Sequence, residues 1–569
     1  MDLLKLQNGS DIRGVAMPGV PGEDVNLNAE AVEAIAGGFV RWLSARVTEN
    51  KTLRVSVGRD SRLSGPAISE TLCAALMRAG VEVTDLGLAT TPAMFMSTVL
   101  PRRPFDAAIM ITASHLPWNR NGLKFFTAKG GAESADIKEI LTLAGEPFPA
   151  GEVPGGRNKS PLISQLALVH FVTEENRTLP ARTKLSPPEG GSPASPCNRS
   201  IPLDGEGGPL AVDEVKIDPH NAWIAEKPKK SRFMDTYAAF LRKKITDAAG
   251  RERPLSGLRI VVDAGNGAGG FFTKKVLEPL GANTTGSRFL NPDGRFPNHA
   301  PNPEASEAMD SIRDAVLESK ADFGIIFDTD VDRAGAVLRS GEELNRNRLI
   351  AMISAVLLRE HPGTTIVTDS ITSTGLAAFI RDRGGMHYRY RRGYRNVINE
   401  ALRLNAEGTD CQLAMETSGH AALKENWFLD DGAYLIVRLL MELACGRDLE
   451  SLIAGLREPA ESREFRLKIT EPDFKACGQR VLDALLDFAR AQNGWTEAPD
   501  NREGVRFSLD DAHGNGWFLL RLSLHDPVLP LNIESDSPGG VRVIAAALRD
   551  FLKTQNGVDA GPLKRFLDA

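Results

Sequence analysis

A serine beside a histidine directly follows an apolar run, and it is the first place where the sequence could carry chemistry. Residues Ala107 to Ile111 predict a buried strand, and the loop Thr112-Ala113-Ser114-His115-Leu116-Pro117 follows it. A serine at such a strand exit is exposed among backbone donors, which suits a hydroxyl that accepts and returns a phosphoryl group. An ordinary serine turn is the simpler explanation of this loop taken alone.

Three aspartates at alternate positions form a second candidate site. Asp328, Asp330 and Asp332 follow the apolar run Phe323–Phe327. If the strand continues through them, alternation of side chains directs all three carboxylates the same way. Such carboxylates repel one another unless a cation or protons neutralise them, and Mg²⁺ prefers oxygen ligands of this kind. A solvated acidic turn is the alternative, whereas an EF-hand lacks its glycine and distal glutamate here.

A third polar loop follows another apolar strand. Glu416 and Ser418, two positions apart and followed by Gly419 and His420, could hydrogen-bond sugar hydroxyls. A helix-capping turn explains the same residues equally well. Four arginines lie just upstream and indicate either a solvated basic face or a phosphate-binding cluster: Arg389, Arg391, Arg392 and Arg395.

The elements that must position these loops form a weak internal repeat. Short β-rich runs alternate with helical stretches, the pattern of α/β units. Three strands end in polar turns, and each is followed by a second strand that enters one of the chemical loops. The first strands are Leu53–Asp60, Leu258–Asp263 and Thr365–Asp369, and the second are Ala107–Ser114, Phe323–Asp332 and Gln412–His420. Because loops at strand carboxyl ends meet at a ligand crevice, we expect the three loops to converge. From about residue 461 the pattern changes to shorter strands and a helix near Val541–Thr554.

Bulk properties exclude several classes of protein. A chain of 569 residues needs several domains. A net charge of −6 provides no global basic field for nucleic acid or anionic membranes, and no apolar run reaches the roughly 18 residues of a membrane span. Five scattered cysteines without a CxxC pair predict a reducing compartment and neither a disulfide framework nor a thiolate zinc site. With no signal or transit segment at Met1 we expect a cytoplasmic protein, or a plastid one if further residues precede it.

Residues 173–230 are rich in Pro, Gly and Ser and predict a disordered, dispensable insertion.

Five motifs, in order, resemble the α-D-phosphohexomutase superfamily. TASHLP with NGLK (Asn121–Lys124) resembles its phosphoserine loop, usually TASHNP with NGxK. DTDVDR resembles its metal loop, usually DGDGDR, and METSGH resembles its sugar-recognition loop, GExSGH. SDIRG (Ser10–Gly14) and VGRDSR (Val57–Arg62) match its first domain. The resemblance covers nearly the whole chain.

The resemblance implies an α/β fold with three similar α/β domains, whose mixed sheets are flanked by helices. A smaller α+β C-terminal domain completes the fold around a central active-site cleft. The expected limits are 1–165 for the first domain, 166–230 for the insertion, 231–345 for the second domain, 346–460 for the third and 461–569 for the fourth.

The resemblance also implies a role for each matching residue. Ser114 would be the phosphoserine and would bind Mg²⁺ together with Asp328, Asp330 and Asp332. The residues expected near the reacting phosphate, as acid/base or charge-stabilising groups, are Arg13, Lys124, Arg333 and His420. Those expected to bind the substrate are Glu416, Ser418, Arg392, Arg395, Arg521 and Ser523.

The implied activity interconverts hexose 1-phosphate and hexose 6-phosphate of the glucose or mannose type. Ser114 would pass its phosphate to the substrate, giving a hexose 1,6-bisphosphate that turns around and returns its other phosphate. The expected state is a monomer or weak dimer, with no nucleic acid or membrane as partner. The alternatives are a phosphoglucosamine mutase, a weakened or inactive sugar-phosphate-binding paralogue with a regulatory role, and a metal-dependent phosphatase without a serine carrier.

The sequence departs from the family motifs in several loops. Leu116 replaces an asparagine, and Thr329 and Val331 replace the glycines between the metal ligands. Thr417 occupies a position that varies with substrate. Where the family has RPSGTEPxxR, residues 521–530 read RLSLHDPVLP and keep Arg521, Ser523 and Pro527. In this last loop Leu524, His525 and Pro530 replace a glycine, a hydroxyl donor and an arginine, which predicts low affinity for ordinary hexose phosphates, or a substrate with a different distal group.

Overall fold

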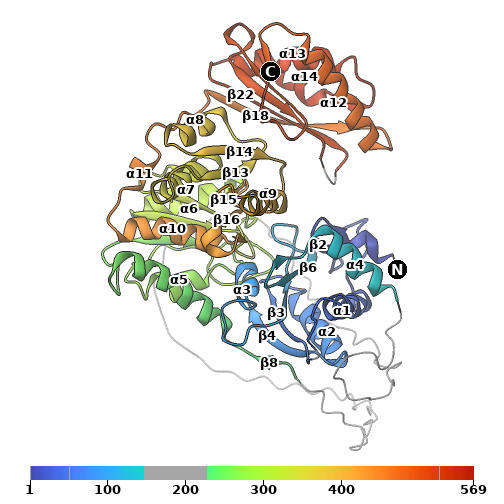
Figure 1. Cartoon of the computed structure of the whole chain (residues 1–569), viewed down its shortest axis with the longest axis vertical. Coiled ribbons are helices and arrows are strands. Elements are labelled where there is room, and N and C mark those ends of the chain that lie inside the picture. The colour runs from blue at the N-terminus through green and yellow to red at the C-terminus, as the bar shows by residue number, and fades with distance from the viewer. Residues whose placement is uncertain (1, 50, 147–226, 524–525) are drawn as a thin grey trace, which may run out of the picture. The chain divides into compact units, whose positions relative to one another are not determined.

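The computed structural model describes residues 2–49, 51–146, 227–523 and 526–569 (Figure 1). The predicted insertion therefore lies outside the described residues except at its end, where Lys229–Lys230 form a short strand, β8. Within the described ranges, no helix is both long and apolar enough to cross a membrane.

The first sheet carries the serine loop. Its strand order is β1-β2-β6-β5-β3-β4-β8, with β7 on β6, and β3 pairs in parallel with both β4 and β5. Helices pack against it around a buried apolar cluster that includes Phe39 and Phe125. The strands are β1 (Gln7–Asn8), β2 (Asp11–Val15), β3 (Arg54–Arg59), β4 (Glu82–Leu88), β5 (Ala107–Ile111), β6 (Arg120–Thr127) and β7 (Gly130–Gly131). The helices are α1 (Ala29–Ser44), α2 (Gly65–Arg78), α3 (Thr91–Met96) and α4 (Ser134–Ala144).

The second and third sheets carry the acidic loop and the sugar loop. Their strand orders are β12-β11-β10-β9 and β14-β13-β15-β16-β17. The second contains β9 (Ile260–Asp263), β10 (Phe323–Phe327), β11 (Ala334–Leu338) and β12 (Glu343–Leu344), with α5 (Phe233–Ala249) and α6 (Ser306–Ser319). The third contains β13 (Thr365–Asp369), β14 (Met386–Tyr390), β15 (Cys411–Met415), β16 (Ala421–Leu423) and β17 (Leu429–Asp430). Its helices are α7 (Arg346–Glu360), α8 (Thr374–Asp382), α9 (Tyr394–Ala406), α10 (Gly432–Ala444) and α11 (Leu449–Leu452).

The predicted repeat is present, and each of its three units contains one more strand than expected. The paired strands β3/β5, β9/β10 and β13/β15 are all parallel, as the alternation of elements predicted. In each unit the chain then turns back into an antiparallel neighbour, β6, β11 or β16. The three chemical loops are therefore reversals between a central strand and its antiparallel partner, and the sheets are mixed.

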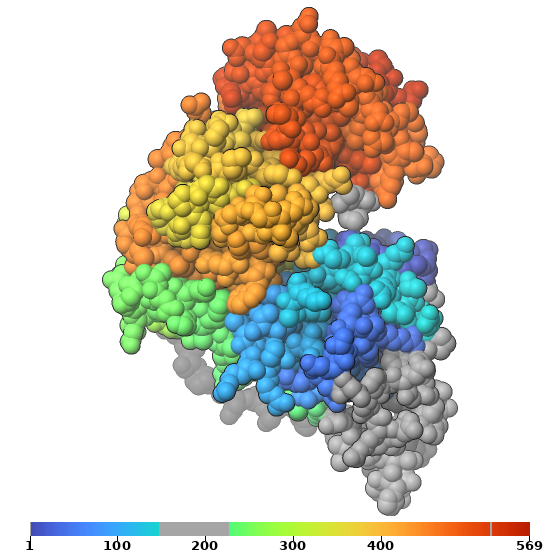
Figure 2. All heavy atoms as spheres, viewed as in Figure 1, coloured from blue at the N-terminus to red at the C-terminus, as the bar shows by residue number. Residues whose placement is uncertain are grey.

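One apolar cluster joins segments from all three units. Met94 and Phe95 of α3 belong to the same buried cluster as Tyr237 of α5 and Leu435 of α10. In Figure 2 the atoms of α5 (green) and α10 (orange) adjoin one another. The start of α3 is consequently held by packing beside the acidic loop of the second unit.

The C-terminal region is an antiparallel sheet covered by helices. Its order is β19-β20-β21-β22-β18-β23, and its core contains Phe518 and Leu548. The elements are β18 (Glu461–Ile469), α12 (Phe474–Arg490), β19 (Trp495–Glu497), β20 (Val505–Leu509), β21 (Gly516–Leu520), β22 (Val528–Ser535), α13 (Gly540–Leu552), β23 (Val558–Asp559) and α14 (Gly561–Asp568). The helix expected near Val541–Thr554 is α13. The expectation of shorter strands was wrong, since β18 has 9 residues and β22 has 8.

Candidate active site

Ser114 occupies the reversal between β5 and β6 in a strained backbone conformation. Its φ of 49° is left-handed, and its backbone N–H donates to Thr112 Oγ1 at 2.9 Å. The serine is buried, with 7% of its surface exposed, so the expectation of an exposed hydroxyl was wrong in this structure. The cause is that Asp328 and Arg333 of the second unit cover it.

Arg62 stabilises the serine loop through hydrogen bonds to its backbone. Its guanidinium donates to four backbone carbonyls, those of Ser114 and Leu116 at 2.5 Å each and those of Pro117 and Arg120 at 2.7 and 2.9 Å. Its Nε lies 3.4 Å from the buried Asp60 carboxylate. Because four hydrogen bonds from one rigid guanidinium meet this loop, its backbone is strongly specified.

The acidic residues converge through a turn and not through strand alternation. Strand β10 ends at Phe327, and Val331 takes a left-handed φ of 67° within the reversal that leads to β11. The prediction from alternation was therefore wrong in mechanism, although one oxygen each of Asp328, Asp330 and Asp332 still lies within 4.8 Å of the others. A β-branched residue in this conformation is strained. The Val331 side chain is fully buried, and the surrounding packing holds its backbone in the left-handed conformation.

This triplet fits a hard cation. All three carboxylates are buried, and burial together with the charges of Asp332 and Asp330 raises the pKa of Asp328 well above its usual range. Within the described residues, Oδ1 of Asp330 and Oδ1 of Asp332 are buried without a hydrogen-bond partner. Buried charged oxygens without partners are costly, and a divalent cation would relieve both that cost and the repulsion. The set is an acidic group that can bind a metal.

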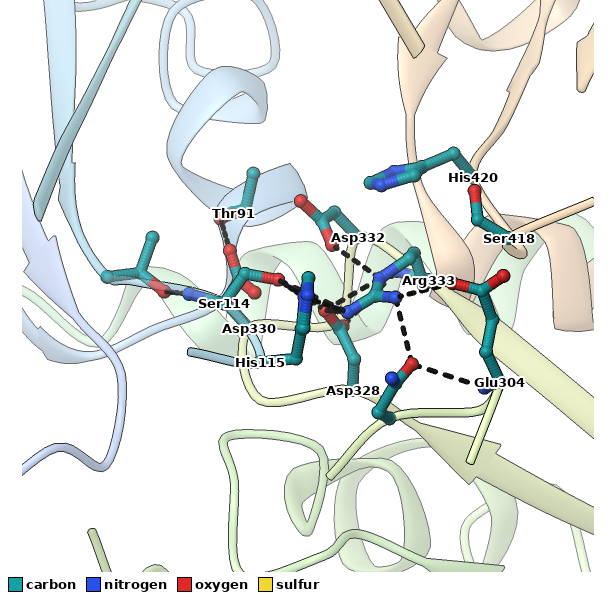
Figure 3. Close-up of polar contacts among 12 residues, drawn as sticks. Thr91, Ser114, His115, Glu304, Asp328, Asp330, Asp332, Arg333, Ser418 and His420 are labelled. Atoms are coloured by element: carbon teal, nitrogen blue, oxygen red, sulfur yellow. Dashed lines mark hydrogen bonds and ion pairs between the residues drawn. The ribbon is translucent and has the colours of Figure 1, made fainter. Parts of the chain in front are cut away.

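Two cations from different units face the triplet. Lys124 Nζ lies 2.5 Å from Asp332 Oδ2 and 3.2 Å from Asp330 Oδ2. Burial alone would lower the pKa of Lys124, but these aspartates raise it well above its usual value. Arg333 donates through Nε to Asp328 Oδ2 at 3.2 Å and through NH2 to Ser114 Oγ at 3.4 Å (Figure 3).

The serine hydroxyl is thus placed between an anion and cations. Ser114 Oγ donates to Asp328 Oδ2 at 3.0 Å, and His115 Nδ1 lies 3.5 Å from the same hydroxyl. Burial, and then the nearby Arg333, lowers the pKa of His115 to about 3, so this ring stays neutral. Arg13 reaches the loop from β2, where NH1 donates to the Thr112 carbonyl at 3.2 Å.

His420 is oriented by two neighbours. Its Nδ1 lies 2.5 Å from Asp430 Oδ2, and the Tyr394 ring stacks on it with a centroid separation of 5.0 Å. Burial alone would lower the pKa of His420, but Asp430 and then Asp332 raise it to about 9. Because a ring nitrogen of His420 also lies within 4.8 Å of an Asp332 oxygen, a protonated imidazole faces the acidic site.

The sugar loop presents one carboxylate and one hydroxyl. Glu416 Oε1 accepts from the Gly393 N–H at 2.6 Å, and Ser418 Oγ donates to Glu416 Oε2 at 3.4 Å. Thr417, which the sequence associated with substrate choice, instead donates its hydroxyl to the buried Asp369 at 2.8 Å. Its side chain therefore stabilises the loop from behind.

The arginines of the third unit divide into two groups. Arg392 lies 3.6 Å from Glu304 and 4.0 Å from Asp369, and Arg395 pairs with Glu133 and the Gly131 carbonyl. By contrast Arg389 is buried against Asp500, at 2.5 Å, and against the carbonyls of Thr372 and Ser373. Arg391 donates to the Arg502 carbonyl. Arg389 and Arg391 thus contact residues of the C-terminal region, whereas Arg392 and Arg395 pair with carboxylates of the three α/β units.

Arg521 lies at the start of the loop that departs most from the family motif. Its side chain is buried, its Nε has no hydrogen-bond partner within the described residues, and burial lowers its pKa. Its backbone N–H donates to the Pro530 carbonyl at 3.1 Å, and the Ser523 N–H donates to the Val528 carbonyl. Pro530 consequently occupies a position inside β22 and not a loop position that a second arginine would take. Residues 524 and 525 lie outside the described residues.

Sequence reasoning missed several residues that hold the site together. Thr91 donates its hydroxyl to Asp330, and Asn302 accepts from Arg333 NH1 at 3.0 Å. Asp430 and Tyr394 hold His420. The paired aspartates 430 and 431 after an apolar stretch were the one local signal that could have directed attention to this segment.

Comparison with known proteins identifies relatives along the chain. Three models described as phosphoglucomutase/phosphomannomutase alpha/beta/alpha domains I, II and III match residues 5–146, 235–341 and 345–459, together more than half of the chain. A phosphomannomutase/phosphoglucomutase of Pseudomonas putida is 29% identical over 96% of this chain and 94% of its own. A phosphoglucomutase of Neisseria gonorrhoeae is 27% identical, covering 89% of each chain.

Solved structures share the fold over nearly the full length. A phosphoglucomutase/phosphomannomutase family protein from Burkholderia thailandensis superposes with a TM-score of 0.70 at 24% identity, covering 98% of each chain. The Paramecium phosphoprotein parafusin, a phosphoglucomutase in its open form, gives a TM-score of 0.66 at 16% identity, covering 99% of this chain and 96% of its own. The fold thus extends through the C-terminal region that the three models leave unmatched.

Proposed function

The chain belongs to the phosphoglucomutase/phosphomannomutase family, and from this premise we propose that it interconverts hexose 1-phosphate and hexose 6-phosphate by way of Ser114. It is a phosphohexomutase, an isomerase. One observation carries the proposal. The Ser114 hydroxyl lies 3.0 Å from Asp328 and beside Arg333, so the serine loop and the acidic loop meet at one oxygen atom.

The first role of the site is to hold a phosphoryl group on Ser114. The NH2 group of Arg333 already points at Oγ and would donate to a phosphate attached there. Asp328, Asp330 and Asp332 would hold Mg²⁺ together with an oxygen of that phosphate. When bound, Mg²⁺ supplies positive charge that neutralises the phosphoryl oxygens.

Phosphoryl transfer then exchanges one P–O bond for another. The bond from phosphorus to Ser114 Oγ breaks while a sugar hydroxyl oxygen bonds to phosphorus, giving hexose 1,6-bisphosphate. After the bisphosphate turns around, its other phosphate returns to Ser114 by the reverse exchange. Arg13, Lys124 and Arg333 surround this position with positive charge, so stabilisation of the transferring group is the main contribution of the protein.

His420 and Lys124 are the candidates for handling the proton. The pKa of each is raised, so both hold a proton at neutral pH. When the sugar oxygen departs from phosphorus it needs a proton, and either group can donate one. That donation leaves the group neutral, and by microscopic reversibility this neutral form takes up the hydroxyl proton when the sugar attacks.

Substrate binding falls to the third and fourth units. Glu416 and Ser418 offer an acceptor and a hydroxyl to the sugar ring; the Gly393 N–H orients Glu416, and Ser418 donates to Glu416. Arg392, Arg395 and Arg521 with Ser523 would bind the phosphate that does not react. A sugar that presents either phosphate to Ser114 needs such a binding site for the other one.

The remaining proposals concern organisation and setting. The four sheets are compatible with domain limits at 1–165, 231–345, 346–460 and 461–569. Strand β8 lies after residue 165 in the sequence but pairs with the first sheet. We expect a monomer or weak dimer in the cytoplasm, with no nucleic acid or membrane as partner.

The test combines mass and activity. Purified protein should carry about one phosphate on Ser114 by intact mass and peptide mapping, and should convert glucose 1-phosphate or mannose 1-phosphate to the 6-phosphate in a coupled assay. Ser114→Ala should lose both and keep its melting temperature, because a loop hydroxyl contributes little to stability. Full turnover by Ser114→Ala would refute the covalent route. Binding of sugar phosphates without turnover in the wild type would favour the regulatory paralogue.

A further inference from the structure

Thr91 connects the first unit to the acidic loop of the second. It is the first residue of α3, and its Oγ1 donates to Asp330 Oδ2 at 2.5 Å. Its backbone N–H also donates to the Asp330 carbonyl at 2.9 Å. Figure 3 shows the threonine directed at this carboxylate, from the side away from Arg333. The two residues lie 239 positions apart in the sequence.

The contact determines which oxygen of Asp330 is free. Oδ2 accepts from both Thr91 and Lys124, whereas Oδ1 is buried and has no hydrogen-bond partner among the described residues. A hydroxyl donor on one oxygen fixes the rotation of the carboxylate about its Cβ–Cγ bond. The other oxygen is then the one available to a cation.

We propose that Thr91 is a positioning residue for the cation site, and that its hydroxyl orients Asp330 to bind Mg²⁺. The inference rests on the proposed function, because it requires that the acidic triplet bind the ion. It adds that the first unit, which contains Ser114, also fixes the orientation of Asp330 in the second unit. The positions of Ser114 and of the metal site are therefore coupled.

Packing makes Thr91 suited to this role. Pro92 restricts the backbone of the helix start, and Thr90 caps it by accepting from the Ala93 N–H at 3.3 Å. Met94 and Phe95 are buried in the apolar cluster shared by three units. Because the helix cannot shift easily, the Thr91 hydroxyl is a fixed point to which the carboxylate adjusts.

The neighbouring threonine supplies a matched control. Thr90 and Thr91 are both buried and both have a hydroxyl engaged, but Thr90 caps its own helix whereas Thr91 contacts the metal loop. Thr91→Val removes the hydroxyl at nearly constant volume, and Thr91→Ser keeps it. Thr90→Val damages the cap without removing the bond to Asp330.

The experiment measures Mg²⁺ binding to metal-free protein by titration calorimetry, with circular dichroism as the folding check. Partners of ligating carboxylates typically change metal affinity by roughly 10- to 100-fold, so Thr91→Val should raise the Kd for Mg²⁺ about tenfold or more. Thr91→Ser and Thr90→Val should bind as the wild type does, although Thr90→Val should melt earlier. At saturating Mg²⁺ the KM of Thr91→Val for the sugar phosphate should be unchanged.

The outcomes separate this inference from the proposed function. Equal Kd values for Thr91→Val and the wild type overturn the positioning role while leaving the metal site intact. An equal loss in Thr90→Val and Thr91→Val overturns it too, because helix damage would then explain the effect. Failure of the wild type to bind Mg²⁺ overturns both the inference and the metal part of the proposed function.

Discussion

Replacing Asp430 by asparagine should change the pH at which the enzyme works. Asp430 lies 2.5 Å from His420 Nδ1, and this carboxylate raises the pKa of His420 to about 9 although burial alone would lower it. An asparagine keeps the shape but removes the charge. The pKa of His420 should then fall to its ordinary value of about 6.5 or below.

The size of the effect follows from the protonated fraction of His420. At pH 8 a group of pKa about 9 is roughly nine-tenths protonated, whereas a group of pKa about 6.5 is about 3% protonated. If the imidazolium is the required form, Asp430→Asn should lose about 30-fold in kcat/KM at pH 8. At pH 5.5 the His420 ring is largely protonated in both the wild type and Asp430→Asn, so the loss of kcat/KM in the variant should nearly disappear.

Stability should change much less than activity. His420 has a raised pKa, so its contribution of about 3 kcal/mol is present below pH 6.5 and is lost as the pH rises through about 9. Burial raises the pKa of Asp430 to about 6, so its charged form costs a similar amount above that pH. The two contributions have opposite signs at neutral pH, so we expect Asp430→Asn to change stability less than activity.

The assay is a pH profile of kcat/KM from pH 5.5 to 9.5, with Asp431→Asn as the control. Asp431 is an adjacent buried aspartate that accepts from the Tyr237 hydroxyl at 2.7 Å and from the Tyr434 N–H. Replacing Asp431 should lower the melting temperature, but it should not shift the pH at which kcat/KM falls on the alkaline side of the profile. A uniform loss at every pH in Asp430→Asn would refute the reasoning, because the carboxylate would then position the ring without tuning its proton.

Three further changes test other parts of the site. A chelator should abolish turnover and Asp328→Asn should weaken Mg²⁺ binding in calorimetry; turnover that survives chelation would make the acidic triplet a polar turn only. Arg62→Lys should lower kcat tenfold or more with little change in KM, because lysine cannot bridge four carbonyls of the Ser114 loop; unchanged kcat would contradict a bracing role. Arg521→Gln should raise KM about tenfold and spare kcat, since a charged hydrogen bond contributes roughly 1.5–3 kcal/mol; a kcat defect alone would count against distal phosphate binding.

The sequence by itself determined the chemical loops and the strands that carry them. Apolar runs that end in Thr112–His115, in the aspartate triplet and in Glu416–His420 are local signals, because a buried strand and its exit depend on residues close in the chain. The parallel pairing within each unit also followed from the alternation of strands and helices. The same signals named Ser114 and the three aspartates, and the structure brings them together.

Only the tertiary structure decided how these residues are held. The carboxylates converge because Val331 turns the chain in a left-handed conformation, which no alternation pattern predicts. Thr417 faces Asp369 and Arg389 faces Asp500, so neither takes the ligand-facing place that its motif suggested. The bond from Thr91 to Asp330 spans 239 residues. Contacts of that separation form when packed units meet, and a sequence pattern describes only what neighbours in the chain impose on one another.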